Sequence, residues 1–285
     1  MGDYSGLLYI VKVNQSARVT MNHNLLRISS DFKTANSESN SNYQVAYNNI
    51  ALLQGITRCV MKSADIPNVF YNISDKGYNF DNTGNNVFYW TNGMGVDKMR
   101  TIPPGQYTVA SLLAYINVHI QVDYPPLYTV KLVQDPVSMK VYVDNLSSLP
   151  FGIYYDGCTV MPYLGFSAAL PVNSVAMRYA AGLPNLAGIQ EVYVTSQKIS
   201  DCSNMVVAAN TMFPVILNIQ IDQPFGSFVH YASQHPEIDD IEYPSLTQGT
   251  NLQLVDIQLR DRWGHILDLQ GMPFNLIVKC YHGSP

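Results

Sequence analysis

The stretch NLQLVDIQLRDRWGHILDLQGMPFNLIVKCYH, residues 251–282, decides the fold class of this chain. Apolar and polar side chains alternate along it in three runs, and the first run places Val255, Ile257 and Leu259 on one face. Alternation with a period of two is typical of a β-strand with one buried face. Because turn residues separate the runs, the sequence predicts an antiparallel meander at this end of the protein.

Two groups of turn residues divide the three runs. Asp261 suits the first position of a type I turn, since its carboxylate can accept a hydrogen bond from the backbone two residues later, and Gly264 suits the fourth. Alternation resumes at Leu267 and Leu269 and again after a Gly-Met-Pro sequence. The last run is expected to turn four side chains inward: Phe274, Leu276, Val278 and Cys280.

The composition is that of a folded chain with little charge. Apolar residues make up 47% of the 285 positions, whereas Asp, Glu, Lys and Arg together make up only 13%, against about 25% in an average soluble domain. Tyrosine is abundant, with 20 residues. A surface poor in charge and rich in tyrosine resembles the core of a protein–protein interface. An ordinary β protein with Asn- and Ser-rich loops is the alternative, and composition alone does not separate the two.

The charge is unevenly distributed. The net charge of −5 argues against binding of nucleic acid by the chain as a whole. Residues 1–62 nevertheless carry +3, so the remainder carries −8. The basic residues of this segment are Lys12, Arg18, Arg27, Lys33, Arg58 and Lys62. The segment could face an anionic partner, although such a bias often has no functional meaning.

The cysteines and the hydropathy pattern place the chain in a reducing compartment. Four cysteines, Cys59, Cys158, Cys202 and Cys280, are widely scattered and form no CxxC motif or Cys/His cluster, so no zinc site is expected. Cys280 is expected on the inner face of the last strand as a small apolar group. No signal peptide is recognisable, and no uninterrupted apolar stretch is long enough to span a membrane.

Strand patterns fall into an early group and a late group. The early group is predicted at 7–13, 21–29, 43–49 and 54–63, with a polar solvent loop at 34–42 and a strand end at Asp65-Ile-Pro-Asn68. The late group is predicted at 192–196 and 213–222 and in the C-terminal runs. We therefore count about four strands before residue 75 and four after residue 190.

The block between these groups has its own pattern. A hairpin is predicted between 78–80 and 87–90, around Asn82-Thr-Gly84. Thr108 is a plausible N-cap for a helix. Strand candidates follow at 127–133, 139–144 and 151–155, and a Leu-Gly-Phe sequence at 164–166 closes the block. The helix is expected to bury one apolar stripe: Leu112, Leu113, Ile116 and Ile120.

This arrangement predicts an all-β fold, a single jelly-roll β-sandwich with an inserted β-rich domain carrying one helix. Residues 1–75 and 186–285 would form the jelly-roll domain, and residues 76–185 the inserted, or upper, domain. An eight-stranded jelly roll buries the inner faces of two sheets. A loop tolerates such an insertion when the two ends of the inserted block lie close together.

Catalytic chemistry has little support in the sequence. His119 lies on the predicted helix without a second histidine one turn away, and a polar surface or interdomain contact is expected for it. His230 and His235 precede the acidic stretch EIDDIE at 237–242, including Asp239, and could bind a cation or place an acid beside a base. Their spacing matches no metal motif, so a solvated or interface loop is expected, and the role of Glu237 to Glu242 stays open. No catalytic residue, cofactor or metal ligand is predicted, and the chain is not expected to be an enzyme.

Three stretches together resemble a family of virion proteins. The first combines NNVF at 85–88, IPPGQYT at 102–108 with its Leu-Leu helix, and LGF at 164–166. The second is LAGI at 186–189 running into VYVTS at 192–196. The third is LRDRWG at 259–264 with LDL at 267–269. They look like the penton or minor capsid proteins of virophages, Polinton-like viruses and related large DNA viruses.

The resemblance covers roughly residues 80–282 and implies a structural role. It implies a homopentamer at the vertex of an icosahedral double-stranded DNA virus, in contact with the major capsid protein (hexon) and minor capsid proteins. It implies a location in the virion, with assembly inside the host cell, and the basic N-terminal segment could contact packaged DNA. A minor capsid or cement protein of the same virion type is one alternative, and a β-sandwich carbohydrate-binding module is another.

Overall fold

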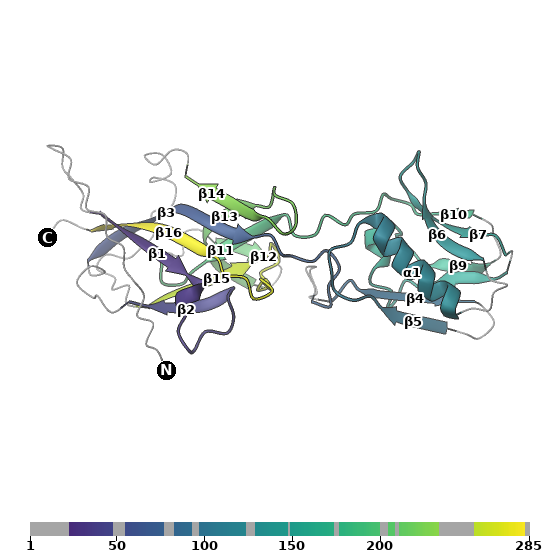
Figure 1. The fold of residues 1–285 in the computed structure, drawn as a ribbon, viewed down its shortest axis with the longest axis horizontal. Coiled ribbons are helices and arrows are strands. Elements are labelled where there is room, and N and C mark those ends of the chain that lie inside the picture. Colours follow the sequence, from purple (N-terminus) through teal and green to yellow (C-terminus); the bar gives the residue numbers. More distant parts are fainter. Residues whose placement is uncertain are drawn as a thin grey trace. The chain divides into compact units, whose positions relative to one another are not determined.

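The computed structural model divides into two compact units, shown in Figure 1. Unit 1 comprises Met1–Phe70 and Ile189–Pro285, and unit 2 comprises Tyr71–Gly188. The structure describes residues 23–47, 55–76, 83–92, 97–123, 129–147, 149–173, 177–199, 205–208, 211–233 and 254–282. The predicted strand at 7–13 and the acidic stretch at 237–242 lie outside these residues.

Unit 1 contains two antiparallel sheets. One has the order β1 (His23–Ser29), β16 (Asn275–His282), β3 (Ile56–Pro67) and β14 (Phe228–Ala232). The other has the order β12 (Met205–Ala208), β13 (Thr211–Gln220), β11 (Glu191–Thr195), β15 (Leu254–Arg260) and β2 (Asn42–Ala46). A short 3-10 helix, η1 (Ser30–Phe32), follows β1.

In unit 1, the first described strand in the sequence pairs with the last, the second with the second-last, and so on toward the middle. β1 pairs with β16, β2 with β15, β3 with β14, and β11 with β13. A chain folded once into a long hairpin and then rolled into two facing sheets gives this order, with β12 added at one edge. The predicted all-β jelly-roll sandwich is therefore confirmed.

The predicted C-terminal meander is wrong. β15 and β16 lie in different sheets, so residues 261–274 cross from one sheet to the other. Leu267 and Leu269 are buried as predicted, but they belong to no regular strand. The backbone N–H of Leu267 donates instead to the carbonyl of Leu259, at 3.0 Å. Alternation shows only that one face is buried, and two facing sheets satisfy it as well as one continuous sheet.

The strand count of unit 1 also differs from the prediction. Six described strands follow unit 2 in the chain rather than four, whereas the three early predictions within the described residues are found as β1, β2 and β3. β3 continues through Pro67, which lies at its last position opposite Phe228. Proline lacks a backbone N–H and therefore cannot donate to a sheet ladder. At the last position of a strand this removes at most one ladder hydrogen bond, so the sheet loses little stability. Cys280 lies on the inner face of β16 and is fully buried, as predicted.

Unit 2 packs two smaller sheets and a helix around one core. The first sheet has the order β5 (Asp97–Thr101), β4 (Val87–Thr91), β8 (Phe151–Ile153) and β9 (Leu170–Asn173). The second has the order β10 (Met177–Tyr179), β7 (Val141–Asn145) and β6 (Val130–Gln134). The helix is α1 (Val109–Asp123), and a 3-10 helix, η3 (Met161–Leu164), follows β8.

The helix forms where the sequence predicts it. The Oγ1 atom of Thr108 accepts from the N–H of Ser111 at 3.1 Å, which confirms the N-cap. The four side chains predicted as its apolar stripe are its buried residues. They pack with Phe88, Trp90 and Phe151 in the core of unit 2.

The strands of unit 2 were predicted only in part. β6 and β7 pair as expected, and β8 lies within its predicted range. β4 pairs with β5 and β8, whereas residues 78–80, its predicted partner, lie outside the described residues. The sequence analysis also missed β9 and β10, because each is too short to show a clear alternation.

Candidate functional site

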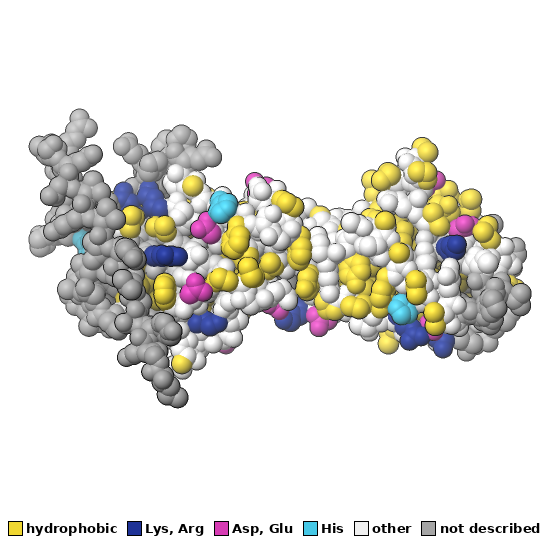
Figure 2. Space-filling model, viewed as in Figure 1, with side chains coloured by type: hydrophobic (Ala, Val, Ile, Leu, Met, Phe, Trp, Pro, Cys, Tyr) yellow, Lys and Arg dark blue, Asp and Glu magenta, His cyan; other side chains and the backbone are white. Residues whose placement is uncertain are grey.

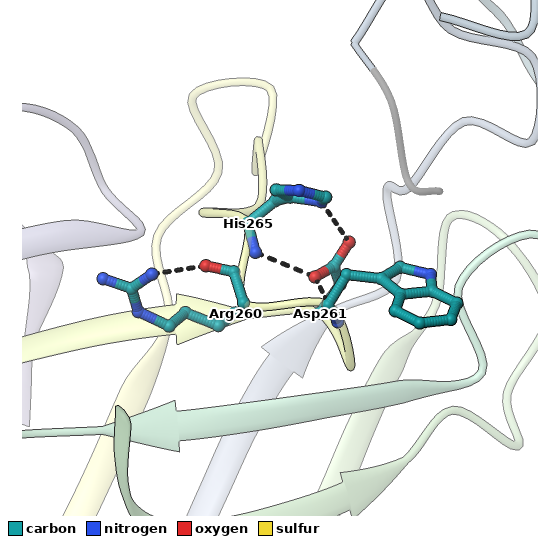
Figure 3. Close-up of polar contacts among 5 residues, drawn as sticks. Arg260, Asp261 and His265 are labelled. Carbon is teal, nitrogen blue, oxygen red and sulfur yellow. Dashed lines mark hydrogen bonds and ion pairs between the residues drawn. The ribbon is translucent and has the colours of Figure 1, made fainter. Parts of the chain in front are cut away.

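The corner at residues 260–265 joins β15 to the crossing between the sheets of unit 1, and Figure 3 shows its polar contacts. The Oδ1 atom of Asp261 accepts from the backbone N–H groups of Trp263 at 2.8 Å and His265 at 2.9 Å. Its Oδ2 atom lies 3.1 Å from Nδ1 of His265. The N–H of Gly264, with φ of 90°, donates to the carbonyl of Asp261 at 3.1 Å, which confirms the predicted turn.

Asp261 therefore has a structural role. The residue is 3% exposed, and both of its side-chain oxygens accept or contact groups of the turn that they stabilise. A buried carboxylate that accepts several N–H groups fixes local backbone geometry. Asp261 and Gly264 of the LRDRWG sequence are thus explained by the turn.

The Arg260 side chain points away from the Asp261 carboxylate (Figure 3). Its Nε atom donates to Oε1 of Gln258 at 3.0 Å, and Nη1 donates to the carbonyl of Gly264. Burial lowers the pKa of the Arg260 guanidinium, and the charge of Asp261 opposes this change. The guanidinium lies over the ring of Phe213, 5.6 Å from its centroid.

Phe213 is the centre of an aromatic cluster beside β11 and β13. Its ring meets that of Tyr193 edge to face at 6.0 Å. The Tyr193 hydroxyl donates to Oε2 of Glu191 at 2.7 Å. Burial, aided by Glu191, raises the pKa of Tyr193 to about 12, so this phenol remains a neutral donor under ordinary conditions. Phe213 is buried, and Tyr193 packs against it, so the cluster belongs to the interior of unit 1.

A buried asparagine joins the two ends of unit 2. Asn72 Nδ2 donates to the carbonyls of Tyr107 at 2.7 Å and Leu186 at 2.9 Å. Its Oδ1 accepts from the N–H of Tyr107 at 2.8 Å. We call these three hydrogen bonds the Asn72 clamp. The clamp ties the segments where the chain enters and leaves unit 2, which is what an inserted block requires. The sequence analysis missed it, because hydrogen bonds to distant backbone groups leave no periodic pattern.

Unit 2 presents an exposed aromatic face on β7 and β10. The ring of Tyr142, which is half-buried, stacks on that of exposed Tyr179 at 4.8 Å, and Met177 on β10 is also exposed. The Tyr179 hydroxyl donates to Oδ2 of Asp135 at 3.4 Å. At the tip of the hairpin between β6 and β7, Val137 is 91% exposed. Figure 2 shows one side of both units, on which apolar side chains lie among uncharged polar ones with few charged groups.

Two shallow cavities could admit small molecules. One of about 330 Å³ in unit 2 is lined by Thr83, Tyr155, Cys158, Thr159, Pro162 and Tyr163. The other, of about 310 Å³ in unit 1, is lined by Lys33, Ser39, Asn40, Ser41, Asp268, Leu269 and Gly271. Both lie at the lower end of the size range of ligand pockets, roughly 300–1,000 Å³. The first combines tyrosine rings with threonine hydroxyls.

The predicted polar residues are placed as follows. His119 lies on α1, half-buried, with its ring 4.6 Å from that of Tyr115, so it makes a local contact within unit 2. His230 lies on β14, with Nδ1 2.6 Å from Oδ1 of Asp65 on β3, and its side chain is 72% exposed. His235 and the acidic stretch at 237–242 lie outside the described residues, so their proposed proximity to His230 stays a prediction.

The basic residues of the N-terminal segment show no common site. Arg27 and Lys33 are exposed on unit 1, and each contacts an asparagine, Asn275 and Asn40 respectively. Lys62 is half-buried on β3. Lys12 and Arg18 lie outside the described residues, as does the side chain of Arg58. Contact of this segment with an anionic partner therefore stays a prediction.

Comparison with solved structures finds distant matches, of which one follows. This chain is similar to the mavirus penton protein. That crystal structure aligns with 92% of this chain and 99% of its own, at 9% sequence identity and a TM-score of 0.47. No family model and no curated protein matches the sequence.

Two further observations concern the described residues alone. They contain no group of three or more His, Cys, Asp or Glu side chains arranged to hold a metal ion. Among them, no helix has both the length and the apolar character needed to cross a membrane. The absence of catalytic and cofactor sites stays a prediction.

Proposed function

We propose that this chain is a structural capsid protein that forms the homopentameric vertex, the penton, of an icosahedral double-stranded DNA virus. The observation that carries the proposal is the outside-inward pairing of β1 with β16, β2 with β15, β3 with β14, and β11 with β13. Jelly rolls of this kind are a common architecture of viral capsid proteins. The resemblance of LRDRWG and the two other stretches to penton and minor capsid proteins supports the same function.

The surface supports self-association. A penton is a closed ring in which one patch of each subunit meets a different patch of its neighbour. The low charge and the partly exposed Tyr142–Tyr179 stack suit such contacts. In this proposal unit 1 is the jelly-roll domain and unit 2 is the inserted upper domain. The partners are four further copies, the hexon and minor capsid proteins, the location is the virion, and assembly occurs inside the host cell.

A carbohydrate-binding module is a second candidate, favoured by the cavity beside Tyr155 and Tyr163. Lectins also use jelly rolls. Tyrosine rings that flank hydroxyl groups suit the faces and edges of a sugar. A minor capsid or cement protein is a third candidate, because it would share the same fold and surface.

Native mass spectrometry and negative-stain imaging of the full chain separate these candidates. A penton gives rings of five copies. A minor capsid protein gives no ring but binds purified hexon, and a carbohydrate-binding module gives a monomer that binds a glycan array. A monomer that binds neither hexon nor glycan would contradict all three.

A pair of matched variants tests the ring contact. β14 is an edge strand of its sheet, and Phe228 on it is 37% exposed. Met272, which is 39% exposed, lies in the crossing between the sheets. If the β14 edge contributes to the ring, Phe228→Lys reduces the pentamer fraction and Met272→Lys leaves it unchanged. Equal pentamer fractions in the two variants would remove β14 from the interface.

A further inference from the structure

Two thiols face each other at the centre of unit 1. Cys59 on β3 and Cys280 on β16 are directly opposite in the antiparallel register. Their Sγ atoms lie 3.5 Å apart, and the two residues are 2% and 0% exposed. β3 and β16 are the two inner strands of their four-stranded sheet. The sulfur atoms therefore meet within the core, on strands whose backbones are held on both sides.

The backbone at this position fits a disulfide. Opposite residues in an antiparallel pair have Cα atoms about 4.5–5.5 Å apart. A disulfide accepts Cα separations of roughly 4.4–6.8 Å. The sulfur atoms need to approach by only about 1.5 Å to reach bonding distance. Rotation about the side-chain bonds supplies such a movement while the strands stay in place.

We propose that Cys59 and Cys280 are the site of a cross-strand disulfide that forms when the protein leaves a reducing environment. With hydrogen peroxide as oxidant, one thiolate attacks a peroxide oxygen and the O–O bond breaks. The departing hydroxide takes up the proton that the thiol lost, so a sulfenic acid and water result. The second sulfur then attacks the sulfenic sulfur, forming the S–S bond and releasing a second water molecule. Two thiols are thereby oxidised and one peroxide is reduced. The proposal does not depend on the function proposed above.

The same surroundings keep the pair reduced while the cell supplies reductant. The hydrogen bond with Cys280 and burial raise the pKa of the Cys59 thiol well above its ordinary value. The thiolate, which is the reactive form, is therefore scarce. Oxidation of the pair is thus slow, and the disulfide forms only after long exposure to an oxidant.

The disulfide would close the jelly roll covalently. It joins residues 221 positions apart, and the whole of unit 2 lies within the closed loop. A disulfide that closes a long loop removes much of the conformational freedom of the unfolded chain. Since β3 and β16 belong to the early and late parts of unit 1, the bond would hold together the parts that the insertion separates in sequence.

The experiment uses the purified full chain, reduced, freed of reductant and then treated with hydrogen peroxide. Trypsin cuts after Arg58, Lys62 and Lys279, so the two cysteines fall in the short peptides CVMK and CYHGSP. After alkylation of remaining thiols under denaturing conditions, we expect the two peptides joined by a disulfide in the unreduced digest. Recovery of both only as alkylated or over-oxidised peptides, or linked to Cys202 instead, would overturn the proposal.

Thermal unfolding gives a second readout. The oxidised chain is expected to have a Tm roughly 5–10 °C above that of the reduced chain, and reductant should reverse the gain. Cys158→Ala is the matched control, because Cys158 is buried in unit 2 and should leave the gain intact. Cys59→Ala and Cys280→Ala should each abolish it. An oxidised wild type that melts no higher than the reduced form would refute the stabilising role, and the peptide map tests the bond even if a variant fails to fold.

Discussion

The two units bury their cores in different ways. Unit 1 joins residues from opposite ends of the chain, as in the pairing of His23–Ser29 with Asn275–His282. Unit 2 relies on local pairs, such as β4 with β5 and β6 with β7, and on a helix that adjoins them in sequence. Unit 1 is therefore complete only after both flanking parts of the chain are made, whereas unit 2 contains all of its own partners. Local pairing also favours faster folding.

The surfaces of the two units differ as well. Among the residues that the structure describes, eleven exposed large apolar side chains lie in unit 2 and six lie in unit 1. The described residues of unit 2 are no more numerous than those of unit 1, so the described part of its surface is the more apolar. Exposed apolar groups mark contacts with other molecules where they form a contiguous patch. The described part of unit 2 therefore has more apolar side chains available for such a patch than that of unit 1.

If the units are separate domains, a core variant in one should leave the other folded. Trp90 in unit 2 is fully buried, and its ring lies 5.0 Å from that of Phe88. Trp90→Ala should lower the free energy of unfolding of unit 2 by roughly 3–5 kcal/mol, because a large core cavity remains. Calorimetry of the full chain should then show one shifted transition and one unchanged transition.

The reciprocal variant is Phe274→Ala in unit 1. Phe274 is also fully buried, and its ring meets that of Tyr43 at 5.3 Å. This variant should shift only the other transition. A single transition that moves in both variants would show that the two units unfold together, and the domain division would then fail.

A variant of the Asn72 clamp tests whether the stability of unit 2 depends on the hydrogen bonds that join its first and last segments. Asn72→Ala removes two donors and one acceptor at a site that is 4% exposed and leaves the backbone groups of Tyr107 and Leu186 unsatisfied. We expect a loss of roughly 2–4 kcal/mol in the stability of unit 2. Hydrogen exchange should increase at the amides of 183–188.

Asn117 supplies the control for this variant. It makes two hydrogen bonds to the backbone of Leu132, at 2.9 and 2.7 Å, but it lies on α1, away from the ends of unit 2 in sequence. Asn117→Ala should destabilise unit 2 by a smaller amount and leave exchange at 183–188 unchanged relative to the rest of the unit. Equal exchange at 183–188 in the two variants would mean that the clamp has no special role.

Sequence periodicity predicted those features of the fold that depend on residues close together in the sequence. The buried stripe of α1, its Thr108 cap and the alternation of β15 are local, and all are confirmed. The same alternation misassigned the C-terminal runs to one sheet, because periodicity identifies the buried face and gives no information on the pairing partner. The Asn72 clamp and the Cys59–Cys280 pair were missed for a related reason. Their partners lie 35 to 221 positions away.

The final contrast between the units concerns buried tyrosine. Tyr43 in unit 1 is 1% exposed, and within the described part of the protein its hydroxyl has no hydrogen-bond partner. Burial raises its pKa well above the ordinary value, which is about 10. In unit 2, Tyr179 is 47% exposed, so water reaches this residue. Alkaline pH should therefore destabilise unit 1 more than unit 2.

The direction follows from linkage between ionisation and folding. The folded state holds Tyr43 neutral, so its stabilising effect is complete below about pH 10, the ordinary tyrosine pKa, and is lost as the pH rises further. The loss is about 1.4 kcal/mol for each pH unit above that value. Tyr43→Phe keeps the ring and removes a buried hydroxyl that has no partner among the described residues, so it should be at least as stable as the wild type at neutral pH. Because it also removes the ionisable group, the difference between the two in the denaturant concentration at half-unfolding should be larger at pH 11. Tyr179→Phe should leave the alkaline unfolding of unit 1 unchanged, and equal alkaline sensitivity of Tyr43→Phe and the wild type would show that Tyr43 reaches water in the folded protein.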